Sequence, residues 1–372
     1  MRLALSLATL LSLGHALAHD GHGTNSAPAP LVPRTAPEQR PPIKPLISVS
    51  RASGVPTSGQ GAWTFVAATH LLPIPPEARP ALKGAHGTII VDADRDTVYW
   101  GLQGVGWIAF SNHLTGSWVV KGDPKLAEGN LHGADLIKRP KGQLPLVAAA
   151  DNLKSRVLVS DTTFTNVQVL GYPTNTSHYA NAAQFKPTDA TWVNTKRFWV
   201  TDGYGEGWVS EASASPLAYT GASFGGHSLS QTPHGVTYDP ASKSLIISAR
   251  PEGKLVFWSL KDHAVEKTLP LPGKQVNNKP SVPTVCDLEL WRDYAVVPCL
   301  DGPGGTPGPI YILNHKKWEI VSIVAPKAEL GFRDAQHIHD AALYLHRGHL
   351  YLLFTNWNPG GIGAAELARV TD

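Results

Sequence analysis

A unit of about 50 residues recurs six times along this chain, and a repeat of that length is typical of propeller blades and solenoids. Each copy opens with a short motif, called the anchor here, and continues with a β-rich run, a polar turn and a second β-rich run. The six anchors begin at His86, His132, Thr188, His234, Thr284 and His339. They are 46, 56, 46, 50 and 55 residues apart, which is near the length of a four-stranded propeller blade.

Two of the copies illustrate the expected strands. After Thr188, residues 190–193 and 197–201 flank a turn at Asn194-Thr195, and after His234 the corresponding runs are 235–238 and 245–248. The chain is rich in turn residues, with 35 Gly and 31 Pro, and no long segment has a helical period. We therefore predict an all-β chain in which residues 46–372 form one six-bladed β-propeller. Residues from about 46 to 80 are expected to complete a blade with a strand from the other terminus.

The N-terminus has the features of a secretory signal peptide. Arg2 precedes a short apolar run, and Ala16-Leu17-Ala18 fits a cleavage site, so we predict a signal peptide over residues 1–18 and a secreted or periplasmic protein. Residues 19–45, dense in Pro and Ala, are predicted to be a flexible tail. In this tail His19 and His22 either hold copper or zinc loosely or belong to a polar disordered end.

Charge and hydropathy exclude two classes of partner. The net charge is +3, and no cluster of Lys and Arg alternates with aromatic residues, so nucleic acid is not an expected partner. The apolar run at the N-terminus is too short to anchor the chain across a membrane. We expect a monomer that acts on, or binds, a small molecule or a peptide.

Only two cysteines are present, Cys286 and Cys299. They lie symmetrically about Arg292-Asp293, so a two-residue turn there would place them directly opposite each other on adjacent antiparallel strands. An exported protein would keep a disulfide at this position. The sequence predicts that disulfide, and two reduced core cysteines are the alternative.

Histidine occupies the anchors of blades one, two, four and six. The innermost strand of each blade lines the central channel, so equivalent anchor positions form a ring around the axis. Because blades two, four and six are about 120° apart in a six-bladed ring, His132, His234 and His339 are expected to converge on one divalent metal ion. Three imidazoles would leave one coordination position open for water or substrate. A reused strand-ending His-Gly motif is the structural alternative.

Other polar residues are expected near the same end of the channel. His86 would break the symmetry of the triad and is not expected to be a ligand, whereas His337 could act as an outer donor or simply pack. The loops after the second strands are expected to gather at one end of the channel. They carry Gln103, Asn152, Tyr204, Arg250, Asp301 and Asn356-Trp357-Asn358. Of these, Tyr204 could act as a base if a cation lowered its pKa, and Arg250 could grip a carboxylate.

Several short motifs resemble peptidyl-α-hydroxyglycine α-amidating lyase, a propeller of the NHL type. They are Leu131-His-Gly-Ala, Phe185-x-Pro-Thr-Asp-Ala, Thr201-Asp-Gly-Tyr-Gly, Pro233-His-Gly-Val, Ser248-Ala-Arg-Pro-Glu-Gly and Ile338-His-Asp-Ala. The resemblance implies that His132, His234 and His339 bind zinc and that Tyr204 acts on the substrate hydroxyl. By the same resemblance, Arg250 corresponds to the arginine of the family's Ala-Asp-Arg-Glu-Asn motif. It also implies a calcium ion in the channel, with Asp340 as its carboxylate.

The chain departs from that family in its first blade. The family has a catalytic arginine there, whereas this chain has Trp100-Gly101-Leu102-Gln103-Gly104. His86 also replaces an apolar residue, and Pro251 follows Arg250 where the family has an acid. Two functions are therefore open. One is a metal-dependent lyase, and the other is a non-catalytic propeller with a structural metal that binds a protein or a small ligand.

Overall fold

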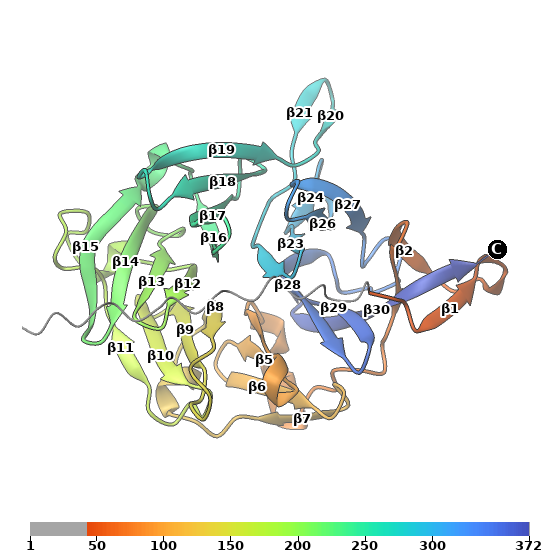
Figure 1. Ribbon diagram of the computed structural model, residues 1–372, viewed down its shortest axis with the longest axis horizontal. Helices are drawn as coiled ribbons and strands as arrows, with labels where there is room; N and C mark the ends of the chain where they lie inside the picture. Colours follow the sequence, from red (N-terminus) through yellow and green to blue (C-terminus); the bar gives the residue numbers. More distant parts are fainter. Residues whose placement is uncertain (1–42, 372) are drawn as a thin grey trace, which may run out of the picture. The chain divides into compact units, whose positions relative to one another are not determined.

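The computed structural model describes residues 43–371, and their sheets form the six blades of a β-propeller (Figure 1). The signal peptide predicted at 1–18 and the histidines His19 and His22 lie outside this range. The inner strands of successive blades lie next to one another around the axis, and the last of them contacts the first. The prediction of an all-β, six-bladed propeller is confirmed.

The first four blades each consist of four consecutive antiparallel strands. Blade one contains β4 (Ile89–Asp92), β5 (Thr97–Leu102), β6 (Gly106–Ser111) and β7 (Gly116–Val119). Blade two contains β8 (Leu131–Ile137), β9 (Leu146–Asp151), β10 (Arg156–Asp161) and β11 (Gln168–Leu170). Blade three contains β12 (Asp189–Asn194), β13 (Arg197–Thr201), β14 (Trp208–Ala214) and β15 (Leu217–Gly225). Blade four contains β16 (Pro233–Asp239), β17 (Ser244–Ala249), β18 (Lys254–Ser259) and β19 (Ala264–Pro270).

The last two blades carry insertions or strands from elsewhere. Blade five contains β22 (Glu289–Trp291), β23 (Tyr294–Pro298), β26 (Ile310–Asn314) and β27 (Glu319–Val324). Two small hairpins accompany it, β20 (Lys274–Val276) with β21 (Lys279–Ser281), and β24 (Asp301–Gly302) with β25 (Thr306–Pro307). Blade six contains β28 (His337–His346), β29 (His349–Trp357), β30 (Gly361–Thr371), β3 (Trp63–Ala67) and β2 (Thr57–Gln60), with β1 (Ile47–Ser50) beside β30.

Strands from both ends of the described range close the ring in blade six. Strand β3 pairs antiparallel with β30, with Phe65 opposite Leu367, and β1 runs parallel to β30, with Ile47 opposite Ala368. This pairing leaves the ring without an open sheet edge at its junction, where unpaired backbone groups would otherwise be exposed. The predicted closure by a strand from the other terminus is therefore confirmed.

Apolar side chains fill the spaces between neighbouring blades. Between blades one and six, fully buried Trp100 packs with Leu353 in one cluster, and between blades five and six Ile312 packs with Phe65 in another. Full burial of each such side chain stabilises the fold by about 1.5–3 kcal/mol. The blades are thus held to their neighbours by side-chain packing, which keeps the inner strands in a fixed ring.

In the part of the chain that the structure describes, the helices are all short 3-10 segments between strands. They are η1 (Arg51–Ser53), η2 (Pro76–Gly84), η3 (Ala93–Arg95), η4 (Pro124–Ala127), η5 (Ala182–Gln184) and η6 (Gly226–Ser228). Within residues 43–371, no helix has both the length and the apolar character required to cross a bilayer.

The predicted disulfide between Cys286 and Cys299 is wrong, because both cysteines are free and buried. The predicted two-residue turn at Arg292-Asp293 does form, since Trp291 pairs with Tyr294. Farther from the turn, however, Val285 rather than Cys286 lies opposite Cys299. A slip of one residue turns a side chain to the other face of a sheet, so the two sulfurs are not presented to each other.

Candidate metal centre on the propeller axis

The innermost strands carry an irregularity at three of the anchor histidines. In blade two the register with β9 shifts between Leu131 and Ala134, on either side of His132. A similar shift occurs on either side of His234 in β16, and another lies between Ile338 and Asp340 in β28. Such bulges re-aim a side chain and are common next to functional sites. The repeated bulge explains how strands that line the channel direct their imidazoles toward one another.

The glycine after two of these histidines is required by the neighbouring blade. A Cβ atom on Gly133 would lie 2.4 Å from the carbonyl oxygen of Thr188, and one on Gly235 would lie 2.4 Å from Asp287 Oδ1. Both distances are shorter than any real Cβ contact, so only glycine fits. The His-Gly pair therefore combines an imidazole aimed at the axis with a backbone that the next inner strand can approach closely.

Four histidines meet at the axis. His132, His234 and His339 are each at most 2% exposed, and their ring centroids are 4.5 to 5.1 Å apart. His86, which precedes β4, joins them with its ring centroid 4.5 Å from those of both His132 and His339. Among residues 43–371, one group of three side chains has ligand atoms within 4.8 Å of one another, and it consists of His86, His132 and His339.

Backbone carbonyls orient two of the imidazoles. His132 Nδ1 lies 2.7 Å from the Thr188 carbonyl, and His234 Nδ1 lies 2.8 Å from that of Cys286. Each Nδ1 therefore donates its proton to the carbonyl, which leaves Nε2 with a free lone pair. Burial, reinforced by nearby positive groups, lowers the pKa of His132 and His234 well below the ordinary value, and it does the same for His339. Neutral imidazoles are the form that binds metal ions.

The nitrogens fit a tetrahedral divalent ion. His132 Nε2 and His339 Nε2 are 3.2 Å apart, and two nitrogens bound to one tetrahedral zinc ion are separated by about 3.3 Å. Because Nε2 of His132 carries a lone pair, two lone pairs would face each other at this distance unless His339 Nε2 carries a proton or both nitrogens bind one cation. His339 Nδ1 is buried without a hydrogen-bond partner in the described part of the chain. The donor set therefore suits a transition metal such as zinc.

Tyr204 and Arg250 reach the same point from loops of blades three and four. The Tyr204 hydroxyl is 2.9 Å from His234 Nε2 and 3.1 Å from His132 Nε2, and it accepts a hydrogen bond of 2.7 Å from Arg250. Burial raises the pKa of Tyr204, an effect that the positive charge of Arg250 opposes. The structure thus brings Tyr204 into contact with the histidine cluster and places Arg250 against Tyr204.

The rim beside the histidines is partly aromatic. The Trp357 ring lies 5.6 Å from that of His86 and 5.6 Å from that of His337. His337 Nδ1 is 2.9 Å from Asp301 Oδ1, so its polar contact is with this carboxylate. Asn152, another of the loop residues, accepts a hydrogen bond of 3.1 Å at its Oδ1 atom from the side-chain amide of Asn130. The expected gathering of loop residues is therefore clearest for Tyr204, Arg250, Asp301 and Trp357.

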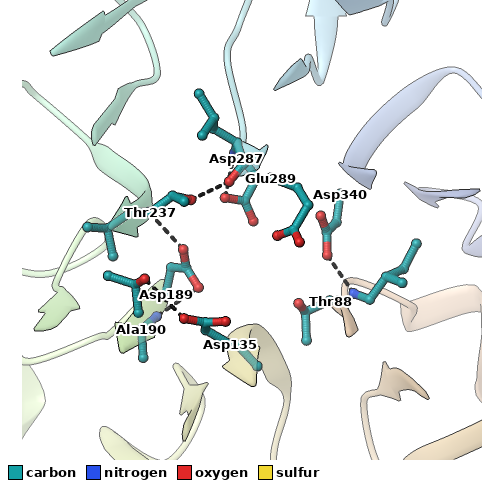
Figure 2. Close-up of a pocket in the computed structure, with 13 residues that line it drawn as sticks. Thr88, Asp135, Asp189, Ala190, Thr237, Asp287, Glu289 and Asp340 are labelled. Atoms are coloured by element: carbon teal, nitrogen blue, oxygen red, sulfur yellow. Dashed lines mark hydrogen bonds between the residues drawn. The ribbon is translucent and has the colours of Figure 1, made fainter. Parts of the chain in front are cut away.

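A second polar cavity lies farther along the inner strands and holds about 30 Å³ of open space (Figure 2). Carboxylates from five positions line it, together with Thr88 and Thr237. They are Asp135, Asp189, Asp287, Glu289 and Asp340. Sequence reasoning named only Asp340 and missed the others. A signal was present, because Asp135 and Asp287 both stand three residues after their anchors, and Asp189 and Asp340 both stand one residue after theirs.

Crowding and burial change the acidity of these carboxylates. Burial raises the pKa of Asp135 and that of Asp340 to about 6. For Asp189, Asp287 and Glu289, burial and the neighbouring carboxylates raise the pKa well above its usual range. Oxygen donors of this kind suit a hard cation such as calcium.

Fold and site together define a six-bladed β-propeller with a histidine cluster at one level of its channel and carboxylates at another. No protein-family model matches the chain, and no curated protein matches it. Similar solved structures include Saccharomyces cerevisiae Sqt1 (9% identity, TM-score 0.46, covering 74% of this chain and 70% of that one). They also include a streptogramin B lyase (12%, 0.48, 83% and 89%) and BBS1N in complex with ARL6DN (11%, 0.45, 75% and 76%). The strand pairing itself, rather than these likenesses, establishes the propeller.

Proposed function

We propose that this chain is a secreted or periplasmic metal-dependent enzyme of the amidating-lyase type, with a divalent ion, most simply zinc, on the axial histidines. The observation that carries the proposal is the position of the Tyr204 hydroxyl, which contacts His132, His234 and Arg250 at once. A buried phenol held between neutral imidazoles and a guanidinium is arranged for proton transfer rather than for packing alone.

The reaction considered is the cleavage of a peptidyl-α-hydroxyglycine. The bond between the amide nitrogen and the α-carbon breaks, the hydroxyl loses its proton as it becomes the aldehyde of glyoxylate, and the nitrogen gains a proton as the peptide amide leaves. A bound divalent ion would polarise a substrate oxygen. Tyr204 Oη, between two imidazole nitrogens, can pass the proton, and the remaining N–H groups of Arg250 can orient the substrate carboxylate.

The carboxylate cavity would hold a second, harder cation, which we propose to be calcium, with Asp340 as one ligand. Burial and mutual repulsion disfavour the charged form of these five carboxylates, and a cation with oxygen ligands would offset that cost. Asp340 directly follows His339 on β28. A cation there would therefore also support the strand that carries one of the axial imidazoles.

One observation favours the alternative of a non-catalytic propeller with a structural metal. Where the lyase family has a catalytic arginine in blade one, this chain has Leu102, which is fully buried on β5. A buried leucine cannot supply that positive charge. In this case the ion would join blades across the channel, and the rim would bind a protein or a small ligand.

Metal analysis and one assay separate the two functions. We would measure the metal content of the full chain after purification and its release of glyoxylate from an α-hydroxyglycine peptide, alongside the variants His132→Ala and Tyr204→Phe. His70→Ala is the control, because His70 is exposed and distant in sequence from every anchor. Turnover by the native chain that both site variants abolish supports the lyase. Bound metal with no turnover supports the structural role, and absence of bound metal contradicts both.

A further inference from the structure

We propose that the ion is held by His86, His132 and His339, and that His234 is instead the hydrogen-bond partner that positions Tyr204. This proposal rests on the proposed metal-binding function and changes its ligand set. Symmetry around the axis favours His132, His234 and His339, one from every second blade. The contacts in the channel favour a set from three consecutive blades, six, one and two.

The first argument is the shape of the cluster. The ring centroids of His86, His132 and His339 form an equilateral triangle with sides of 4.5 Å. With His234 in place of His86, the sides are 4.5, 4.9 and 5.1 Å. The three imidazoles whose nitrogens all approach within 4.8 Å are those of the first set.

The second argument concerns hydrogen bonds already made. Tyr204 has one hydroxyl proton, and because Arg250 donates to the hydroxyl oxygen, that proton is available for a histidine. The shorter distance is to His234 Nε2, at 2.9 Å, compared with 3.1 Å to His132. With its Nδ1 on the Cys286 carbonyl as well, His234 has partners at both nitrogens.

His86 differs from His234 in its hydrogen bonding. Its ring is half-buried and contacts the rings of His132, His339, Tyr204 and Trp357, but it makes no hydrogen bond within residues 43–371. A polar group in such surroundings lacks the partner that it requires once water is excluded. A cation shared with His132 and His339 would supply that partner.

With this ligand set, the ion and the polar residues that would contact a substrate come from opposite sides of the channel. The ligands come from three consecutive blades, and the inner strand β28 of blade six contacts the inner strand β4 of blade one. Tyr204, His234 and Arg250 come from the facing blades three and four, and Asp301 from blade five follows them. A substrate would therefore lie between an ion held on one side and its polar contacts on the other. The ion would also join blade six to blade one.

The test is a titration of the metal-free full chain with Co²⁺, followed by visible absorption and calorimetry, and then by competition with Zn²⁺. His86→Ala should weaken Co²⁺ binding by more than the roughly 10–100-fold that loss of an outer partner causes. His234→Ala removes an outer partner at most, so it should weaken Co²⁺ binding by no more than about 10–100-fold. His70→Ala serves as the control.

Two further variants preserve packing if the alanine variants unfold. His86→Phe keeps a ring without a ligand nitrogen, and His234→Gln keeps a hydrogen-bond acceptor for Tyr204. Loss of Co²⁺ binding in the His234 variants with retention in the His86 variants would overturn the proposed ligand set while leaving the metal-dependent function intact. Failure of the native chain to bind Co²⁺ or Zn²⁺ would overturn the ligand set and the proposed function together.

Discussion

Arg250 donates a hydrogen bond of 2.7 Å to the hydroxyl of Tyr204, and its guanidinium carbon lies 5.7 Å from the centre of that ring. Burial raises the pKa of Tyr204, and the positive charge of Arg250 opposes that rise. In the proposed reaction, this contact would support a negative charge on the phenol during proton transfer.

Tyr204→Phe should remove proton transfer without removing the metal. We expect kcat for an α-hydroxyglycine peptide to fall about 10²–10⁴-fold, the usual contribution of a positioned acid or base, while metal content stays unchanged. Loss of a buried partner for Arg250 should cost about 1–3 kcal/mol of unfolding free energy. Tyr238→Phe, near the end of β16, is the control. Unchanged kcat in Tyr204→Phe would contradict the assigned role.

The cysteines should behave as two unreactive thiols. Both are fully buried, and burial raises the pKa of Cys286 to about 11, so little thiolate is present at neutral pH. A thiol reagent should therefore label neither cysteine in the folded protein and both after denaturation without reductant. Denatured protein with no reactive thiol would mean that the two are joined by a disulfide.

Gly133→Ala adds only one methyl group but should destabilise the protein strongly. The added Cβ would lie 2.4 Å from the backbone oxygen of Thr188, so two inner strands would have to move apart. We expect a loss of about 1–3 kcal/mol in denaturant unfolding, typical of forced overpacking. Gly171→Ala is the matched control, because a Cβ atom added at Gly171 would meet no neighbouring atom within 4 Å. A change within about 0.5 kcal/mol for both variants would contradict the close approach.

Burial of the axial carboxylates should contribute a destabilisation of the chelated protein that grows as pH rises. Burial raises the pKa of Asp135 and that of Asp340 to about 6 in the folded state. The pKa of an aspartate in the unfolded chain is about 4. At these two groups the folded state binds more protons than the unfolded state between the two pKa values, so their contribution to the unfolding free energy falls as pH increases. The axial histidines, whose pKa values are lowered in the folded state, contribute in the opposite sense over the same pH range. The carboxylate contribution is therefore measured against a variant, and added Ca²⁺ should offset the destabilisation above about pH 6.

Asp135→Asn is the variant that checks this assignment, because it removes one titrating group and keeps an acceptor for the Trp192 amide. The melting temperature of this variant, relative to that of the native chain, should rise from about pH 4 to about pH 6. A difference between the two chains that stays constant across this window would show that burial does not raise the pKa of Asp135.

The sequence by itself determined the repeat, the strand positions and the arrival of the anchor histidines at the axis, because each depends on local patterns. Runs such as 197–201 match β13 since alternation and turn residues act over a few neighbours. The tertiary structure alone decided the register that separates Cys286 from Cys299 and brought His86 into contact with the other axial imidazoles. Both depend on bulges and on contacts between blades far apart in the chain, which no local pattern encodes.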